Sequence, residues 1–121
     1  FGGSRQTIEE VAEKGFEPWL DEQMEMEPSL ILPLIQPTYD EYVEYLIENG
    51  DDPDEIPYRP WWDLYSFAWW QSNMTTNDIL RHRIAFALSE ILVVSANSEL
   101  YEYGDGLADY YDIFNTNAFG N

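Results

Sequence analysis

The stretch Ile84-Ala-Phe-Ala-Leu-Ser-Glu-Ile-Leu-Val-Val94 is the longest apolar segment of the chain and decides the predicted fold. Drawn as a helix, it is apolar almost all round, with a single Ser-Glu interruption. A helix that is apolar on most faces is buried on most faces. We therefore predict a central helix over residues 76–95, capped at its start by Thr76 or Asn77. The residues expected to be buried are Ile84, Leu88, Ile91 and Leu92.

Helix-start and helix-stop residues outside this stretch predict five further helices. Threonine followed three residues later by glutamate, the capping-box pattern, occurs at Thr7 and again at Thr38. Prolines at positions 28, 33 and 37 are expected to prevent a long helix in this part of the chain. The predicted helices cover residues 7–14, 18–24, 38–50, 61–71 and 107–115, and residues 51–60 form a loop.

The predicted fold class is all-α, because no segment shows the alternation of a half-buried strand. We expect an irregular bundle of about six helices, with at least about 50% helix against a usual ~30–35%, and no sheet of three or more strands. A single domain over residues 1–121 is predicted, with an acidic helix-loop half (1–60) and an aromatic core half (61–121). Sixteen of the 24 carboxylates lie between Glu9 and Glu55, which favours this division.

The composition limits the partners that this chain can have. It carries 24 acidic and five basic residues, which gives a net charge of −19. Nucleic acid and anionic membranes are not expected partners, because binding either requires Lys and Arg to displace counterions. Cations and basic protein surfaces match this charge better. The lack of cysteine excludes disulfides and thiolate metal sites, and no stretch approaches the ~20 apolar residues that span a bilayer.

Several short motifs follow one another along the chain. They are Trp19-Leu-Asp-Glu-Gln23, the run Leu80–Ser95 that opens with Leu-Arg-His-Arg, Tyr110-Tyr-Asp112 and Ala118-Phe-Gly-Asn121. In order and spacing these four motifs resemble the bacterial family known as domain of unknown function 1800. The opening Phe1-Gly-Gly is also similar to the start of that family, and the resemblance covers essentially the whole chain.

The resemblance implies an exported bacterial protein of several hundred residues, in which the Ala-Phe-Gly-Asn motif continues into another helix. The chain is therefore expected to be the N-terminal fragment of a longer protein outside the cell or on its surface, although no signal peptide is visible. Members often have a histidine just before this motif, where this chain has Asn117. The resemblance implies no activity or catalytic residue, and no cofactor is predicted.

The residues that could form a charged site are Arg81, His82, Arg83 and Glu90. Three of them lie near the start of the predicted central helix, where the helix dipole disfavours positive charge, so other groups must hold them. Arg83 and Glu90 share a helix face, and we predict that both are buried and paired, with each other or with Asp109 or Asp112. A clamp for an anion or a substrate carboxylate is the functional alternative.

His82 is the only histidine of the chain. A lone histidine cannot form a histidine-rich metal site, and the spacing identifies no nucleophile with an adjacent base. General acid–base catalysis with Glu90 or Asp78 is one hypothesis for this residue. A structural histidine with satisfied hydrogen bonds is the other.

Four carboxylates of the predicted loop provide oxygen ligands of the kind that calcium prefers. They are Asp51, Asp52, Asp54 and Glu55. The sequence lacks the alternation and the glycine of an EF-hand loop, which favours a solvated charge run over a metal site.

Two pairs of adjacent tryptophans lie eight residues apart, close to two helical turns, and so present overlapping faces. They are Trp61–Trp62 and Trp69–Trp70. Adjacent rings cannot both lie on one narrow face, so one of each pair is expected to pack inward and the other to meet a neighbouring element or a partner. We expect at least one of the four to be exposed in the isolated chain and covered in the complete assembly. A platform for stacking sugars is the alternative to packing.

No complete catalytic constellation can be recognised in the sequence. The leading hypothesis for function is an exported or cell-surface structural or protein-interaction module that packs against the rest of its chain or against other subunits. The alternative is part of a secreted enzyme or carbohydrate-handling protein whose active site lies beyond residue 121.

Overall fold

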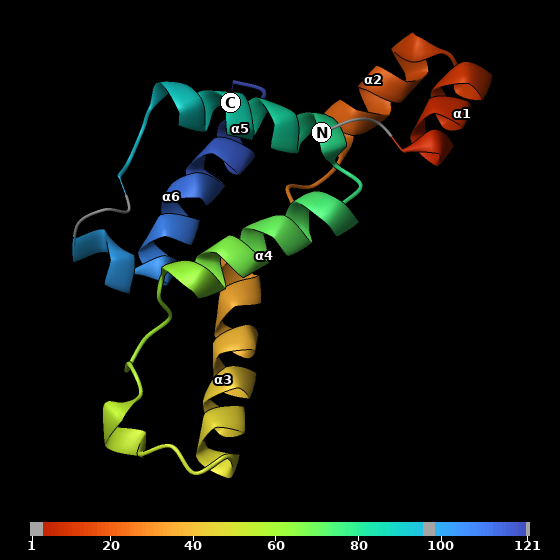
Figure 1. Cartoon of the computed structure of the whole chain (residues 1–121). Helices are drawn as coiled ribbons and strands as arrows, with labels where there is room; N and C mark the ends of the chain where they lie inside the picture. The colour runs from red at the N-terminus through yellow and green to blue at the C-terminus, as the bar shows by residue number, and fades with distance from the viewer. Residues whose placement is uncertain (1–3, 96–98, 121) are drawn as a thin grey trace.

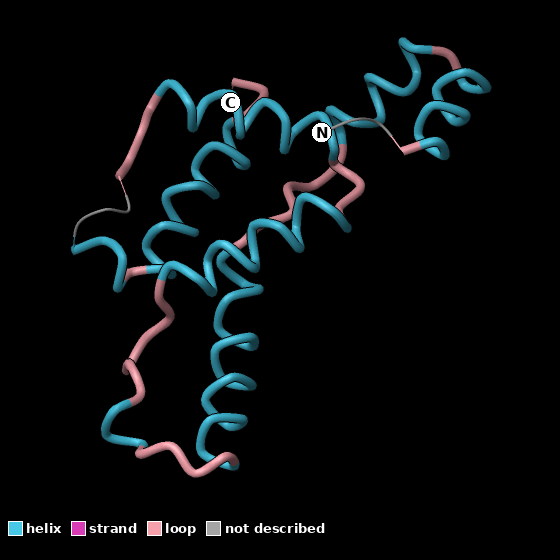
Figure 2. The backbone as a smooth tube through the Cα atoms, in the orientation of Figure 1, coloured by secondary structure: helices cyan, strands magenta, loops and turns pink. Residues whose placement is uncertain are grey.

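The computed structural model describes residues 4–95 and 99–120, and within these ranges the chain is 75% helical with no β-strand. The helices cross one another at steep angles (Figures 1 and 2). They are α1 (Arg5–Lys14), α2 (Phe16–Glu25), α3 (Leu32–Glu48), α4 (Trp62–Thr75), α5 (Ile79–Ile91) and α6 (Gly104–Asn117), with the short 3₁₀ helices η1 (Pro53–Glu55) and η2 (Glu99–Glu102). The predicted all-α class and high helix content are confirmed.

The helices α1 and α2 form a hairpin that projects from the rest of the molecule and packs on it mainly through α2 and α5 (Figure 1). Ser4 caps α1 by accepting a hydrogen bond from the N–H of Thr7 (3.0 Å), so the cap predicted at Thr7 is three residues too late. Gly15 has φ of 90°, a backbone conformation that favours glycine, and this allows the tight turn between the two helices.

The expectation that prolines would prevent a long helix is wrong, because α3 runs for 17 residues through Pro37. Pro33 lies in the first turn, where a missing N–H removes no helical hydrogen bond. Pro37 does remove one, and the complete burial of Ile31 and Ile35 offsets this loss. Thr38 donates its hydroxyl to the carbonyl four residues before it (2.8 Å), so it lies inside the helix and does not cap it.

The central helix of the bundle is α6 rather than α5. It contacts α3, α4 and α5 and spans the space between α5 and the start of α4 (Figure 1). Seven of its 14 residues are buried. On α5, by contrast, the buried face consists of Arg81, His82 and Ala85, two of which are polar.

The prediction for α5 is wrong at both of its ends. The capping residue is Asp78 rather than Thr76 or Asn77, and the helix ends at Ile91, so the last apolar residues of the stretch follow it in non-helical backbone. Ile91 and Leu92, predicted to be buried, are 74% and 54% exposed. The other two residues of the predicted buried set are half-buried: Ile84 and Leu88.

Small residues bring the crossing helices close together. The core contains one alanine from each of α4, α5 and α6, and its members are Ile31, Ile35, Ala68, Ala85, Ala108, Tyr111 and Phe114. At the start of α6, the N–H of Gly104 donates to the carbonyl of Pro60 (2.9 Å). A Cβ at Gly104 would lie 2.4 Å from the carbonyl oxygen of Trp61, so only glycine fits there. Within the described ranges, no helix has the length and apolar character needed to cross a membrane.

Candidate functional site

A buried polar cluster surrounds residues 26–31, the segment that links α2 to α3. This segment is not helical, so its buried backbone N–H and C=O groups need partners from elsewhere. Side chains from α6 and from the start of α5 provide these partners. The buried polar members of the cluster are Gln23, Asp78, Arg81, His82, Asp112 and Asn115.

Asp112 on α6 caps the start of α3. Its carboxylate accepts hydrogen bonds from the N–H groups of Ile31 (2.8 Å) and Leu32 (2.8 Å), which are the N-cap and the first residue of that helix. N–H groups at a helix start have no partner within the helix, and the helix dipole favours a negative charge beside them. Asp112 therefore fixes α3 on α6 across 80 residues of sequence.

Two residues at the start of α5 hold the earlier part of the segment 26–31. They are Asp78, which is the N-cap of the helix, and Arg81, which lies in its first turn. Asp78 accepts hydrogen bonds from the N–H of Ser29 (2.8 Å) and from the hydroxyl of Thr76. Burial raises the pKa of Asp78, but these hydrogen bonds outweigh it and bring the pKa below its ordinary value. Arg81 donates to the carbonyl of Met26 (2.9 Å) and to a carbonyl of α6 (3.0 Å), with its Nε 3.9 Å from Asp78.

Two buried amides complete the cluster. Gln23 on α2 donates to the carbonyl of Asn77 (2.9 Å) and accepts from the N–H of Leu80 (3.0 Å), so it fixes α2 on the start of α5. Asn115 on α6 donates to the carboxylate of Asp112 (3.3 Å). Because buried polar groups are costly when unpaired, the bonds of Gln23 favour one arrangement of α2 on α5, and Asn115 supports the carboxylate that caps α3.

His82 lies beside this network, and neither of its ring nitrogens has a hydrogen-bond partner. The side chain is 3% exposed, with Nε2 3.6 Å from the carboxylate of Asp78. Burial lowers the pKa of His82 by more than Asp78 and Asp112 raise it, so the imidazole is neutral at pH 7. Because the ring is almost completely buried, a substrate has no direct access to it, which favours a structural role over acid–base chemistry.

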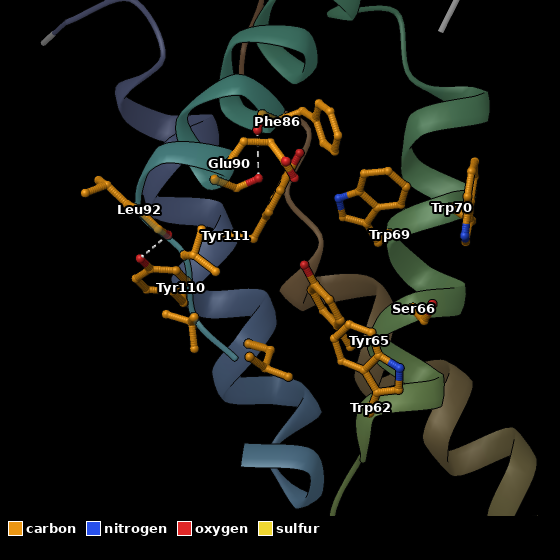
Figure 3. Close-up of a pocket in the computed structure, with 14 residues that line it drawn as sticks. Trp62, Tyr65, Ser66, Trp69, Trp70, Phe86, Glu90, Leu92, Tyr110 and Tyr111 are labelled. Atoms are coloured by element: carbon orange, nitrogen blue, oxygen red, sulfur yellow. Dashed lines mark hydrogen bonds between the residues drawn. The ribbon is translucent and has the colours of Figure 1, made fainter. Parts of the chain in front are cut away.

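A groove of about 430 Å³ lies between α4 on one side and α5 and α6 on the other (Figure 3). Tyr65 and Trp69 project into it from α4, and Tyr111 faces them from α6. Trp69 meets Tyr111 edge to face, with ring centroids 6.2 Å apart and an angle of 85° between the planes. At the rim, the hydroxyl of Tyr110 donates to the carbonyl of Leu92 (2.9 Å) and fixes the segment after α5.

Four of the six buried polar residues of the cluster come from the motifs along the chain. Trp19–Gln23 provides Gln23, the run from Leu80 provides Arg81 and His82, and Tyr110–Asp112 provides Asp112. The ring of Phe119, from the last motif, lies 4.5 Å from the guanidinium of Arg81. A family model described as a protein of unknown function, DUF1800, matches residues 1–121, the whole chain. The chain belongs to the DUF1800 family. No curated protein matches it, and no solved structure does.

In this DUF1800 chain, the four residues that the sequence groups as a charged site are divided between the interior and the surface. Arg81 and His82 are buried, whereas Arg83 and Glu90 are exposed, so the prediction that the last two are buried is wrong. Successive residues of a helix point about 100° apart, and the face of α5 against the core is the one that carries positions 81, 82 and 85.

The carboxylates of the predicted calcium loop are all exposed: Asp51, Asp52, Asp54 and Glu55. Asp52 caps η1 by accepting a hydrogen bond from the N–H of Asp54 (3.0 Å). Among the described residues, no three or more His, Cys, Asp or Glu side chains gather in a way that could hold a metal ion. The calcium hypothesis for this loop is therefore not supported.

The prediction that one tryptophan of each pair packs inward agrees with the exposure of the pair Trp69–Trp70 near the end of α4. Trp70 is 52% exposed, while the other three are half-buried: Trp61, Trp62 and Trp69. At least one exposed tryptophan was expected, and Trp70 is that residue. Its coverage in a complete assembly stays a prediction.

The sequence did not reveal the structural roles of Gln23 and Asn115. It suggested Asp112 as an ion-pair partner on α5, whereas the structure shows it bound to backbone N–H groups at the start of α3. Gln23 and Asp112 do carry a signal, because each is the final polar residue of a motif that begins with large apolar or aromatic residues. Such a residue on a buried helix face is expected to pair with backbone groups of another element. The sequence does not indicate which element that is.

Proposed function

We propose that this DUF1800 domain is a protein-interaction module that binds a polypeptide segment in the groove between α4 and α5. The observation that carries the proposal is a band of exposed apolar residues beside an aromatic groove. Val93 is 73% exposed and Trp70 is 52% exposed, and neither is needed to close the core. Soluble proteins seldom leave contiguous apolar surface open to water unless it meets a partner.

The band is presented in a fixed position. It comprises Ile91, which is the last residue of α5, and Leu92, Val93 and Val94, which follow the helix as non-helical backbone. The hydrogen bond from Tyr110 to the carbonyl of Leu92 holds this backbone at the groove rim. A preformed apolar surface loses little entropy when a partner docks on it, which favours binding.

The polar cluster supports the same proposal because its polar groups are already used within the fold. Its carboxylates, its guanidinium and its amides hold the backbone of residues 26–32 and the start of α5, so these groups are occupied by the fold. The groove is left as the better place for an external ligand. The resemblance of the motifs to a commonly exported family supports placing the module outside the cell or on its surface.

Site-specific photo-crosslinking in the intact protein tests the proposal. A photoreactive amino acid at position 93 should give covalent adducts with a polypeptide segment, either of the same protein or of another subunit. The control position is Glu48, which is also exposed but lies at the far end of α3. Adducts at equal yield from both positions, or none from position 93, would refute the proposal.

A further inference from the structure

The groove between α4 and α5 has walls made of aromatic rings (Figure 3). An aromatic face attracts cations through its electron-rich centre, and several faces around one space form a cage for an ammonium or guanidinium group. The cavity of about 430 Å³ is large enough for such a side chain. The aromatic lining residues are Trp62, Tyr65, Trp69, Trp70, Phe86, Tyr110 and Tyr111.

The charge of the lining favours a cation from outside. Among the described residues that line the groove, Glu90 is the sole charged one, and it is exposed. None of the described lining residues is basic. Three of the basic side chains pair with acids elsewhere, at Glu9, Glu22 and Asp105. A carboxylate on an aromatic wall, in a chain with a net charge of −19, attracts positive ligands and repels negative ones.

Tyr111 adds a buried polar group to the same wall. It is 3% exposed and lines the groove, and its hydroxyl lies beside the indole of Trp69. Burial raises the pKa of Tyr111 to about 12 and outweighs the hydrogen bond with Trp69 that lowers it, so the hydroxyl keeps its proton at neutral pH. A phenolic oxygen both donates and accepts, so it offers an N–H donor of a ligand an acceptor on this wall.

The same combination already holds a guanidinium elsewhere in this molecule. Arg59 lies 4.2 Å from the centre of the Tyr103 ring and 2.6 Å from the carboxylate of Asp105. Arg81 shows a related arrangement, with the ring of Phe119 on one side and Asp78 on the other. The groove has the same two components, an aromatic ring (Trp69) and a carboxylate (Glu90). Its described lining contains no basic residue that could occupy the space between them.

We propose that the groove recognises an arginine or lysine side chain of its partner polypeptide, held between the aromatic walls and paired with Glu90. This inference rests on the proposed function and specifies the chemistry of the partner. The apolar residues at 91–94 contact the neighbouring side chains of the partner, and the cation gives the contact its selectivity.

Three synthetic peptides distinguish the two levels of the proposal. They share the flanking sequence Ala-Leu-x-Leu-Ala and carry arginine, uncharged citrulline or glutamate at the centre. Binding to the intact protein is followed by tryptophan fluorescence and by calorimetry. The arginine peptide should bind about tenfold more tightly than the citrulline peptide, as expected for a desolvated cation–π contact with a carboxylate nearby, and the glutamate peptide should bind most weakly.

Matched variants locate the effect. Glu90→Gln should weaken the arginine peptide at least about fivefold and leave the citrulline peptide unchanged, because it removes charge without removing volume. Asp109→Asn is the control, since Asp109 is an exposed carboxylate on α6 that does not line the groove. Tyr111→Phe should also weaken the arginine peptide, because it removes the buried hydroxyl from the groove wall and leaves the ring in place.

The outcomes separate this inference from the proposed function. If no peptide binds, both fail. If all three peptides bind equally well and Glu90→Gln leaves their affinities unchanged, the groove binds polypeptide without discriminating by charge. Only this inference is then overturned. If a neutral oligosaccharide binds in place of the peptides and loses affinity on Trp69→Ala, the groove is a sugar platform and both proposals are wrong.

Discussion

The polar cluster and the aromatic groove use different residues of α5 and α6 and differ in how far the chain closes them. In the cluster, side chains from α6 and from the start of α5 hold the backbone of residues 26–32 with hydrogen bonds of 2.8–2.9 Å. In the groove, Trp70 and Val93 remain largely exposed beside a cavity. Both are built on α5 and α6, yet the cluster is buried whereas the groove stays open beside exposed apolar side chains.

This difference assigns separate roles to the two regions. Charged and amide groups are costly to bury unless they are paired, so a cluster of them constrains how helices can be arranged. Aromatic surface is costly to leave in water, so an open aromatic groove favours association. We infer that substitutions in the cluster act mainly on the free energy of unfolding, whereas substitutions in the groove act mainly on binding.

The largest loss of stability is expected from Asp112→Ala. The substitution leaves two N–H groups at the start of α3 without an acceptor. It also removes a negative charge that interacts favourably with the dipole of α3. The free energy of unfolding should fall by about 3–5 kcal/mol, measured by chemical denaturation. Asp109→Ala on the same helix is exposed and should change it by less than about 0.5 kcal/mol. Equal effects would show that Asp112 has no special role.

A comparison of two neighbouring arginines follows. Arg81→Met should cost about 3 kcal/mol, because carbonyl groups at Met26 and on α6 lose their donor and Asp78 loses a nearby positive charge. Arg83→Met should cost less than about 1 kcal/mol, because Arg83 is exposed and surface ion pairs contribute little. Thermal unfolding of both variants checks the order. The reverse order would restore the sequence-based assignment of Arg83 to the interior.

The extent of successful prediction has a physical explanation. Helix caps and periodicity are local, so the all-α class and most helix positions could be predicted. The buried face of α5 depends on which helix lies beside it. The sequence indicates a hub at Ile84–Val94, but Arg81 faces the core because α6 and the segment 26–31 offer it partners. The start of α3 likewise depends on its cap by Asp112, which is distant in sequence.

The close approach of α6 to α4 predicts a smaller effect at a single glycine. Gly104→Ala would place a Cβ 2.4 Å from the carbonyl oxygen of Trp61, and relieving this clash should cost about 1–3 kcal/mol. Gly106→Ala, two residues later in the same helix, meets only an ordinary contact at 3.7 Å. That control should be neutral or more stable by up to about 1 kcal/mol, because alanine favours helix. Equal destabilisation of both variants would show that α6 does not press on α4 as described.

Acidification should weaken the polar cluster through His82. Its pKa in the folded chain lies below its ordinary value of 6.5 because of burial, so the unfolded chain takes up the proton more readily. The stability that neutral His82 contributes is complete above that value and is lost as the pH falls below it. Between about pH 7.5 and 5.5, wild type should therefore lose more stability than His82→Gln does. Identical pH profiles would show that His82 is no more difficult to protonate in the folded chain.

The smallest effect is expected at Ile91, which the sequence places in the interior and the structure places on the surface at the end of α5. Ile91 is 74% exposed, so Ile91→Ala should change the free energy of unfolding by less than about 0.5 kcal/mol. Leu88, one turn earlier on α5, packs against the core, and Leu88→Ala should cost about 2 kcal/mol. Denaturation curves of the two variants provide the comparison. If Ile91→Ala were as destabilising as Leu88→Ala, the apolar band after α5 would belong to the core, and the groove would lose the open rim on which its proposed role in binding depends.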